Sequence, residues 1–152
     1  MTSTHATTPT SIGTGERRVS RRIVVAATPA EVFALLTDPR EHPALDGSGT
    51  VKALVDGPAR LTAGSVFRMK MSGYTTENRV VEFVPDAVIA WRHRARHVWR
   101  WELRAVAGGT EVTETFDHTA KRCPGVVAAL GVPKRAGAAI DATLRRLQAR
   151  FA

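Results

Sequence analysis

From Val88 to Thr119 the sequence alternates between apolar and polar side chains with a period of two, which is typical of half-buried β-strands. The alternation is interrupted twice by short turn-like stretches, so it predicts three consecutive antiparallel strands. One face carries mainly aromatic and apolar side chains: Ile89, Trp91, His93, His97, Trp99, Trp101, Leu103, Val112, Glu114, Phe116 and His118. The other face carries Arg, Glu and Thr side chains. We expect the polar face to be solvated and the aromatic face to be covered by another element.

Side-chain parity predicts the register of these strands, because directly opposed residues on neighbouring strands point to the same face. A three-residue loop, 94–96, gives the first set of pairs: His93 with His97, Trp91 with Trp99, and Ile89 with Trp101. A turn at 107–109 gives the second set: Leu103 with Val112, Trp101 with Glu114, Trp99 with Phe116, and His97 with His118.

The segment before this stretch predicts one strand, two short helices and three further strands. Residues 19–27 are rich in β-branched side chains and predict the first strand. Thr28, Pro29 and Glu31 have the spacing of a helix N-cap with a capping box. Asp38 and Pro39 repeat the cap-then-proline pattern, so we expect a second short helix that ends at 47–49. Strands are then expected over 51–55, 65–72 and 74–84, separated by turns that contain glycine.

A long amphipathic helix is predicted from Lys134 to Phe151, after a short apolar piece at 124–132. Its apolar positions recur at spacings of three and four: Ala136, Ile140, Leu144, Leu147 and Phe151. The first half of the helix is built of small residues and the second half of large ones. Small residues facing an aromatic sheet predict a cavity, although close packing of helix and sheet explains the same alanines.

Length and composition fit one globular domain. The 152 residues are enough to bury a sizeable core, and 43% of them are hydrophobic. Residues 1–18 are rich in Thr, Ser and Gly and are expected to be a disordered tail, with the folded domain over 19–152. No stretch has the length of apolar sequence that a membrane span needs. The single cysteine, Cys123, excludes a disulfide framework and fits a reduced, cytoplasmic setting.

The formal net charge of +8 raises the hypothesis of a nucleic-acid partner. The arginines are scattered, however, and on the outer face of the predicted sheet Glu102, Glu111 and Asp117 accompany them. This pattern is typical of a solvated surface with ion pairs, and it argues against nucleic-acid binding.

The predicted order of elements and three phrases resemble the START-like superfamily (SRPBCC), in the branch of polyketide cyclases/dehydrases and lipid transport proteins. The phrases are IVVAATPAEVFALLTDPREHP, RVVEFVPDAVIAWRH and GGTEVTETFDHT, and the resemblance covers nearly everything after about Arg18. It implies an α+β helix-grip fold, in which a curved antiparallel sheet of about seven strands wraps around the long C-terminal helix. It also implies a ligand cavity between the two. Members of this superfamily bind lipids, sterols or polyketides, and some are enzymes, so the fold does not fix the function.

Glu114 is the most informative single candidate, since the predicted register places its carboxyl group beside Trp101 on an apolar face. Burial there should raise its pKa, and a glutamate with a raised pKa suits general acid or base catalysis, with His93 or His118 as its partner. An ion pair with an arginine is the alternative.

The three histidines His93, His97 and His118 are predicted neighbours, which allows a metal site, a proton shuttle or simply a polar rim at the cavity. We favour the rim and expect neither a metal nor another cofactor. The remaining candidates for ligand contact are His42 and Asp46 on the second short helix, Tyr74, the aromatic face and the terminal helix: Trp91, His97, Trp99, Trp101, Phe116, Ala136, Ile140 and Leu144.

Three functions follow from these observations. The first is a carrier, sensor or store for a hydrophobic or aromatic small molecule such as a lipid or polyketide. The second is an enzyme of the cyclase or dehydratase type that uses Glu114 and a histidine. The third is an interaction module for ribosome or RNA that uses the basic outer face. The sequence indicates neither the ligand nor the oligomeric state.

Overall fold

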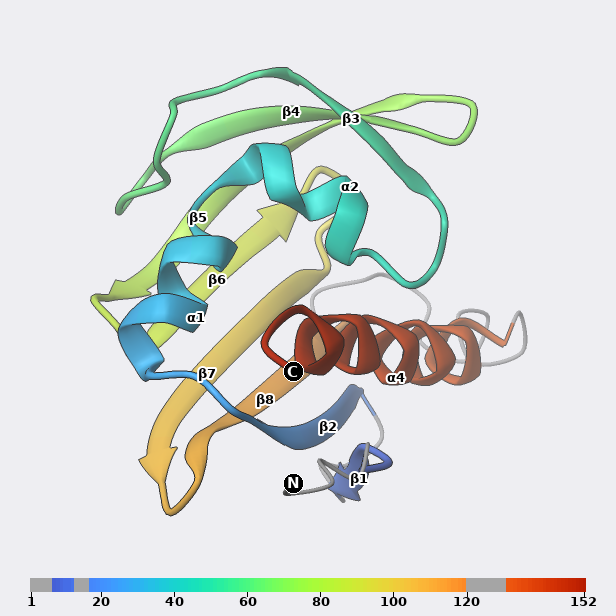
Figure 1. The fold of residues 1–152 in the computed structure, drawn as a ribbon. Coiled ribbons are helices and arrows are strands. Elements are labelled where there is room, and N and C mark those ends of the chain that lie inside the picture. The colour runs from blue at the N-terminus through green and yellow to red at the C-terminus, as the bar shows by residue number, and fades with distance from the viewer. Residues whose placement is uncertain (1–6, 13–16, 120–130) are drawn as a thin grey trace.

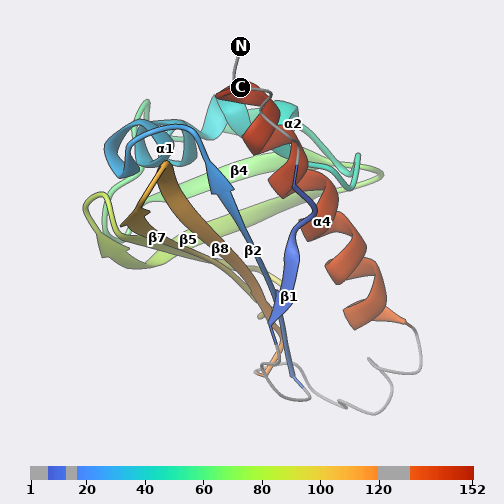
Figure 2. The same cartoon turned by 60° about the horizontal axis from the view of Figure 1, so that its bottom comes forward.

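The fold is an α+β arrangement, in which one curved antiparallel sheet faces a long C-terminal helix (Figures 1 and 2). The structure is a computed structural model that describes residues 7–12, 17–119 and 131–152. The described part of the chain has eight strands: β1 Thr10–Ile12, β2 Arg18–Val25, β3 Val51–Asp56, β4 Val66–Met71, β5 Thr75–Val84, β6 Val88–His93, β7 Val98–Val106 and β8 Gly109–Asp117. Their order across the sheet is β1-β2-β8-β7-β6-β5-β4-β3.

The helices lie on the concave side of the sheet. They are α1 Pro29–Leu36, the 3₁₀ helix η1 Pro39–Glu41, α2 His42–Leu45 and α4 Val132–Arg150. Figure 1 shows α4 near the β2 and β8 end of the sheet and α2 between α4 and the β3 end. Helix α4 packs mainly against β2, and α2 contacts both β3 and α4. Within the described ranges, no helix is long and apolar enough to span a membrane.

The predicted register of β6, β7 and β8 is confirmed. Ile89 is opposite Trp101, and Trp101 is in turn opposite Glu114. The outer face carries the predicted ion pairs between arginine and glutamate. Arg100, for example, lies 2.9 Å from Glu82 and 2.8 Å from Glu102. The face of the sheet that holds Trp101 and Leu103 is buried, with 4% and 6% of these residues exposed.

The predicted helix starts are also confirmed. Thr28 caps α1: its hydroxyl oxygen accepts a hydrogen bond from the Glu31 N–H, and the Glu31 carboxylate accepts one from the Thr28 N–H. This reciprocal capping box satisfies backbone donors that the first turn of a helix leaves free. The carboxylate of Asp38 caps η1 in the same way, by accepting from the Arg40 N–H at 3.1 Å. The two caps explain why the chain forms two short helices in succession.

The segment 1–18, expected to be a disordered tail, contains a short strand in the part that the structure describes. Thr10–Ile12 form β1, which pairs with the free edge of β2, and Ser11 lies opposite Arg21. This strand is short and mostly exposed, so its pairing depends on backbone hydrogen bonds rather than on the apolar alternation that would reveal it in a sequence. Arg18, also assigned to the tail, begins β2. Cys123 and the apolar piece from Pro124 to Leu130 lie outside the described residues.

Helix α4 has the predicted buried stripe. Ile140, Leu144 and Leu147 are fully buried against the sheet and the short helices. The loop after α2 closes onto α4 at Gly47, whose N–H donates to the Thr143 hydroxyl oxygen at 2.9 Å. A Cβ atom at Gly47 would lie 2.4 Å from the Ala142 Cβ, so only glycine permits this close approach. The contact holds α2 and the following loop above the sheet.

Candidate functional site

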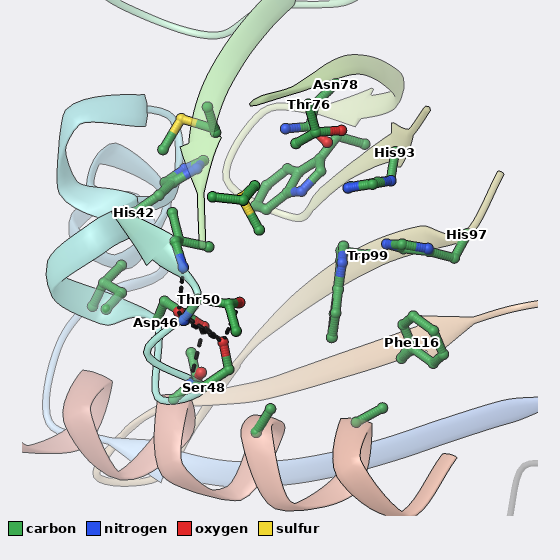
Figure 3. A pocket seen from close by; sticks show the side chains of 18 of the residues that line it. His42, Asp46, Ser48, Thr50, Thr76, Asn78, His93, His97, Trp99 and Phe116 are labelled. Atoms are coloured by element: carbon green, nitrogen blue, oxygen red, sulfur yellow. Dashed lines mark hydrogen bonds between the residues drawn. The ribbon is translucent and has the colours of Figure 1, made fainter. Parts of the chain in front are cut away.

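A pocket of about 310 Å³ lies between the concave face of the sheet, α4 and the loop that follows α2. Figure 3 shows this arrangement: Trp99, Phe116, His93 and His97 come from the sheet, and Asp46, Ser48 and Thr50 come from the loop after α2. The small residues Ala136 and Ala139 line the pocket from α4. The volume lies at the lower end of the range of about 300–1,000 Å³ that is usual for small-molecule sites.

Apolar and aromatic side chains form most of the pocket lining. Trp91 stacks on the His42 ring with centroids 4.8 Å apart, and Phe67 meets both rings edge-on. On the other side, Trp99 packs against Phe116 with centroids 4.8 Å apart. Flat rings that are held by one another in this way offer rigid surfaces to a planar ligand.

His42 contributes to this lining as a neutral ring. Its Nε2 lies 2.8 Å from the Leu36 carbonyl oxygen, which requires Nε2 to carry the proton and donate. Burial lowers the pKa of His42 because the charged form would lose its hydration. His42 lines the pocket, and its contact with a ligand stays a prediction, while its Nε2 is engaged in holding α1 and α2 together.

The histidines gather at the end of the pocket near the β6–β7 hairpin. His93 and His97 stack with centroids 4.2 Å apart, and the His97 ring lies 5.0 Å from that of Phe116. Tyr74, which is 54% exposed, lines the same end, and its ring lies 6.3 Å from that of His93. Of the three histidines expected to form a polar rim, His93 and His97 line the pocket and His118 does not. Among the described residues no three His, Cys, Asp or Glu side chains are grouped as metal ligands.

Glu114 lies in the interior of the pocket and is only 5% exposed. Burial raises the pKa of its carboxyl group well above the usual range, and the negative charge of Asp46 raises it further. The alternative, an ion pair of the Glu114 side chain with an arginine, is not observed among the described residues. Its Oε2 is buried and has no hydrogen-bond partner in the described structure. Burial and the absence of a partner therefore both favour the protonated form of the Glu114 carboxyl group over its carboxylate.

Two further buried polar atoms of pocket residues lack partners in the described part of the chain, namely the Trp101 Nε1 and the Thr76 Oγ1. Thr76 is 2% exposed and Trp101 is 4% exposed. A buried donor or acceptor without a partner costs about 1–3 kcal/mol. A ligand or solvent that reached these atoms would recover that free energy.

Asp46 lines the pocket, but its carboxylate is engaged by its own loop. It accepts hydrogen bonds from the backbone N–H groups of Ser48, Thr50 and Val51 at 3.0–3.1 Å, and from the Ser48 hydroxyl at 2.8 Å (Figure 3). Asp46 thus shapes this side of the pocket, and the contact expected for it with a ligand has to compete with these bonds.

Three residues predicted for the site do not line the pocket. Ile140 and Leu144 are fully buried in the core beneath it, because the long side chains of α4 point into the packed layer. His118 is also buried, and its ring stacks on that of Phe116 with centroids 5.4 Å apart.

The predicted pairing of Glu114 with a histidine meets a geometric obstacle. His118 lies four residues beyond Glu114 on the chain. Ile89, Trp101 and Glu114 lie side by side on β6, β7 and β8, and His93 lies four residues beyond Ile89. Four residues of a strand span about 13 Å. An acid/base pair of Glu114 with either histidine, which stays a prediction, would therefore act on different atoms of a ligand rather than on the same one.

Several lining residues escaped the sequence analysis. Met69 and Met71 line the pocket from β4, and Thr76 and Asn78 line it from β5. The alternation over 66–71 could have placed the two methionines on the inner face. Thr76 and Asn78 gave no such signal, because polar side chains in a strand normally indicate the solvated face.

The chain was compared with known proteins. The family described as polyketide cyclase / dehydrase and lipid transport matches residues 16–152. The uncharacterized protein Rv0088 of Mycobacterium tuberculosis is 41% identical over 154 residues, which cover 95% of this chain and 69% of that protein.

Solved structures show the same fold. A protein of Rhodobacter sphaeroides aligns with a TM-score of 0.72 at 22% identity, over 93% of this chain and 96% of that one. DynU16, from the dynemicin biosynthetic locus, aligns with a TM-score of 0.61 at 21% identity, over 86% of this chain and 46% of that one. The family match spans residues 16–152, which is most of the chain, so this chain belongs to the polyketide cyclase / dehydrase and lipid transport family.

Proposed function

We propose that this protein binds an apolar, ring-bearing small molecule in the pocket between the sheet and α4, as a carrier, sensor or store. One observation carries the proposal: the pocket combines rigid aromatic surfaces with small residues on α4 that leave its volume unfilled. Closely packed alanines would have removed the pocket, yet Ala136 and Ala139 border it.

The family supports the same reading, because its description includes lipid transport as well as polyketide cyclases and dehydrases. The ring surfaces favour a flat molecule over a flexible chain, since stacked aromatic contacts reward planarity. A volume of about 310 Å³ suits a ligand of two to four fused rings rather than a whole phospholipid.

Filling the pocket from α4 tests the proposal. Ala139→Phe places a ring into the space that Ala139 borders, and we expect it to weaken the binding of fluorene, a flat three-ring hydrocarbon, by about tenfold or more, since occupied volume excludes the ligand. The affinity is measured by equilibrium dialysis. Native mass spectrometry of the purified protein shows in addition whether an aromatic or lipid molecule accompanies it.

Ala138→Phe is the matched control, because Ala138 is the preceding residue of the same helix but is exposed and does not line the pocket. It should bind fluorene like the unchanged protein. Absence of fluorene binding by the unchanged protein, or equal binding by the two variants, would contradict the proposal.

An enzymatic function is the second candidate, and the buried carboxyl group of Glu114, whose pKa is raised by burial, favours it. Such a group can act as a general acid toward a carbonyl oxygen. Glu114 would donate its proton to a ring ketone while water takes the proton from the neighbouring carbon. The enol would then return to the ketone by taking a proton from solvent at that carbon and giving its O–H proton back to the Glu114 carboxylate.

Exchange of the α-protons of 1-tetralone in deuterated water, followed by mass spectrometry, separates the two functions. An enzyme should accelerate the exchange, and Glu114→Gln should remove the acceleration while altering affinity only modestly. A protein that only binds should leave the exchange rate at that of buffer. Acceleration that survives Glu114→Gln would contradict the role of Glu114.

A further inference from the structure

We propose that the Trp101 N–H and the Glu114 carboxyl group together form a two-donor site for one carbonyl oxygen, and that the ligand is therefore an uncharged ring ketone. The inference rests on the proposed binding function and specifies its ligand. It assigns to Trp101 and Glu114 the selection of a ligand by its oxygen rather than by its shape alone.

The position of the two residues is the first argument. Trp101 on β7 is directly opposite Glu114 on β8, and both line the pocket. Side chains of directly opposed residues leave the same face of a sheet with their Cβ atoms about 4.5–5.5 Å apart. Two donors that start so close can reach a single oxygen atom placed above them.

The second argument is that both groups are buried and unused. The Trp101 Nε1 and the Glu114 Oε2 have no solvent exposure, and within the described residues neither has a hydrogen-bond partner. Native proteins rarely leave buried polar groups without a hydrogen-bond partner. Where no protein atom is the partner, a bound ligand or water molecule usually is. Two such groups on directly opposed residues of β7 and β8 thus indicate one acceptor atom of a ligand that binds both.

The protonation state of Glu114 supports this arrangement. A carboxylate would only accept hydrogen bonds and would repel a carbonyl oxygen, whereas a neutral carboxyl group donates its O–H. Burial and the charge of Asp46 both favour the neutral form of Glu114. An apolar site can keep a carboxylic acid neutral at pH 7 so that it serves as a donor.

The chemistry of the two donors selects the class of ligand. A carbonyl oxygen has two lone pairs and can accept from the indole N–H and from the carboxyl O–H at once. A hydrocarbon of the same shape would leave both donors unpaired, and such sites discriminate strongly against analogues that lack the polar atom. The aromatic rings of Trp99 and Phe116 then hold the flat body of the ketone.

The test compares 9-fluorenone with fluorene, which have the same three-ring outline and differ by one carbonyl oxygen. Equilibrium dialysis should show that the protein prefers fluorenone by about tenfold to a hundredfold, as expected for two hydrogen bonds to otherwise unsatisfied groups. Trp101→Phe, which removes the N–H but keeps a ring, should reduce this preference about three- to tenfold. Trp99→Phe is the matched control, because it removes an indole from the same pocket and should weaken both ligands without changing their ratio.

Glu114→Met removes the second donor at similar size and should reduce the preference by a similar factor. The infrared carbonyl stretch of bound fluorenone provides a measurement on the unchanged protein, and it should shift to lower frequency relative to fluorenone in hexane. Equal affinities for the two compounds, or an unshifted carbonyl stretch, would overturn the two-donor site while leaving the proposed pocket intact. Failure of both compounds to bind would contradict the pocket and the two-donor site together.

Discussion

The burial of Glu114 affects both the stability of this protein and the chemical properties of its pocket. The Glu114 side chain is 5% exposed, and within the ranges that the structure describes no cation pairs with it, so its charged form would be costly. Burial and the nearby charge of Asp46 accordingly raise the pKa of its carboxyl group well above the usual range. A protonated carboxyl group can donate a hydrogen bond, which is the role that the proposed two-donor site gives to Glu114.

The raised pKa predicts how stability depends on pH. In the unfolded chain Glu114 titrates near the ordinary value of a glutamate, about 4.3. Above that pH the folded protein holds a proton that the unfolded chain has lost, so the contribution of Glu114 to stability falls as pH rises toward the pKa of the folded state. The fall is at most about 1.4 kcal/mol per pH unit. Below about pH 4.3 the contribution is fully present.

Urea denaturation at several pH values between 4 and 8 measures this effect. Glu114→Gln cannot ionise, so its stability relative to the unchanged protein should increase as pH rises through this window. Glu102→Gln is the control, since Glu102 is exposed on the outer face and pairs with Arg100. Parallel pH profiles for Glu114→Gln and the unchanged protein would show that Glu114 is not held neutral.

At the scale of elements, the patterns that rest on local chemistry predicted the structure well. The capping box at Thr28 and Glu31 fixed the start of α1, and side-chain parity fixed the register of β6, β7 and β8. Both signals lie in residues close in sequence or opposed across a tight turn. The strand β1 gave no such signal, because it is held by backbone hydrogen bonds to the edge of β2.

Strand β5 shows why the candidate site was harder to predict. Between Val80 and Glu82 its pairing with β6 shifts register, so Val81 and Glu82 are both exposed while Val80 is buried. A bulge of this kind breaks the period of two on which sequence analysis depends. Thr76 and Asn78, on the same strand, are buried polar residues that face the pocket. Their inward direction follows from the sheet as a whole and not from their own polarity.

The loop after α2 is the element that depends most on one side chain. The Asp46 carboxylate accepts three backbone hydrogen bonds from this loop, which lines the pocket. We expect Asp46→Ala to lower the free energy of unfolding by about 1–3 kcal/mol, because hydrogen bonds to a charged group are lost. It should also weaken fluorene binding, since this side of the pocket loses its fixed shape.

Asp56→Ala is the appropriate control for Asp46→Ala. Asp56 is an exposed aspartate whose ion pair with Arg68, at 2.9 Å, lies on the surface. Such pairs contribute about 0–1 kcal/mol, so this variant should stay close to the unchanged protein in stability and in binding. Equal effects of the two substitutions, measured by urea denaturation, would show that the carboxylate of Asp46 has no special role in the loop.

At the scale of the whole molecule, α4 has two functions that divide along its length. Its small residues Ala136 and Ala139 border the pocket, and its large residues Leu144 and Leu147 fill the core. Additional interactions join its second half to the short helices: Arg146 donates to the Asp46 carbonyl oxygen at 2.8 Å, and Arg150 pairs with Glu41 at 3.1 Å. The pocket can therefore stay unfilled because the other end of the helix supplies the packing that holds the helix on the sheet.

This division predicts that substitutions in the two halves of α4 have opposite consequences. Leu144→Ala should lower the free energy of unfolding by about 2–5 kcal/mol, because Leu144 is fully buried and its removal leaves a cavity in the core. Leu144→Met nearly conserves the volume and should cost less than about 1.5 kcal/mol. Ala139→Phe should instead reduce fluorene binding while changing stability less than Leu144→Ala, since it enters space that is already empty. Urea denaturation of the three variants measures these changes in the free energy of unfolding. A decrease below about 1 kcal/mol for Leu144→Ala would mean that the second half of α4 does not anchor the helix. The pocket would then lack the support that keeps it open.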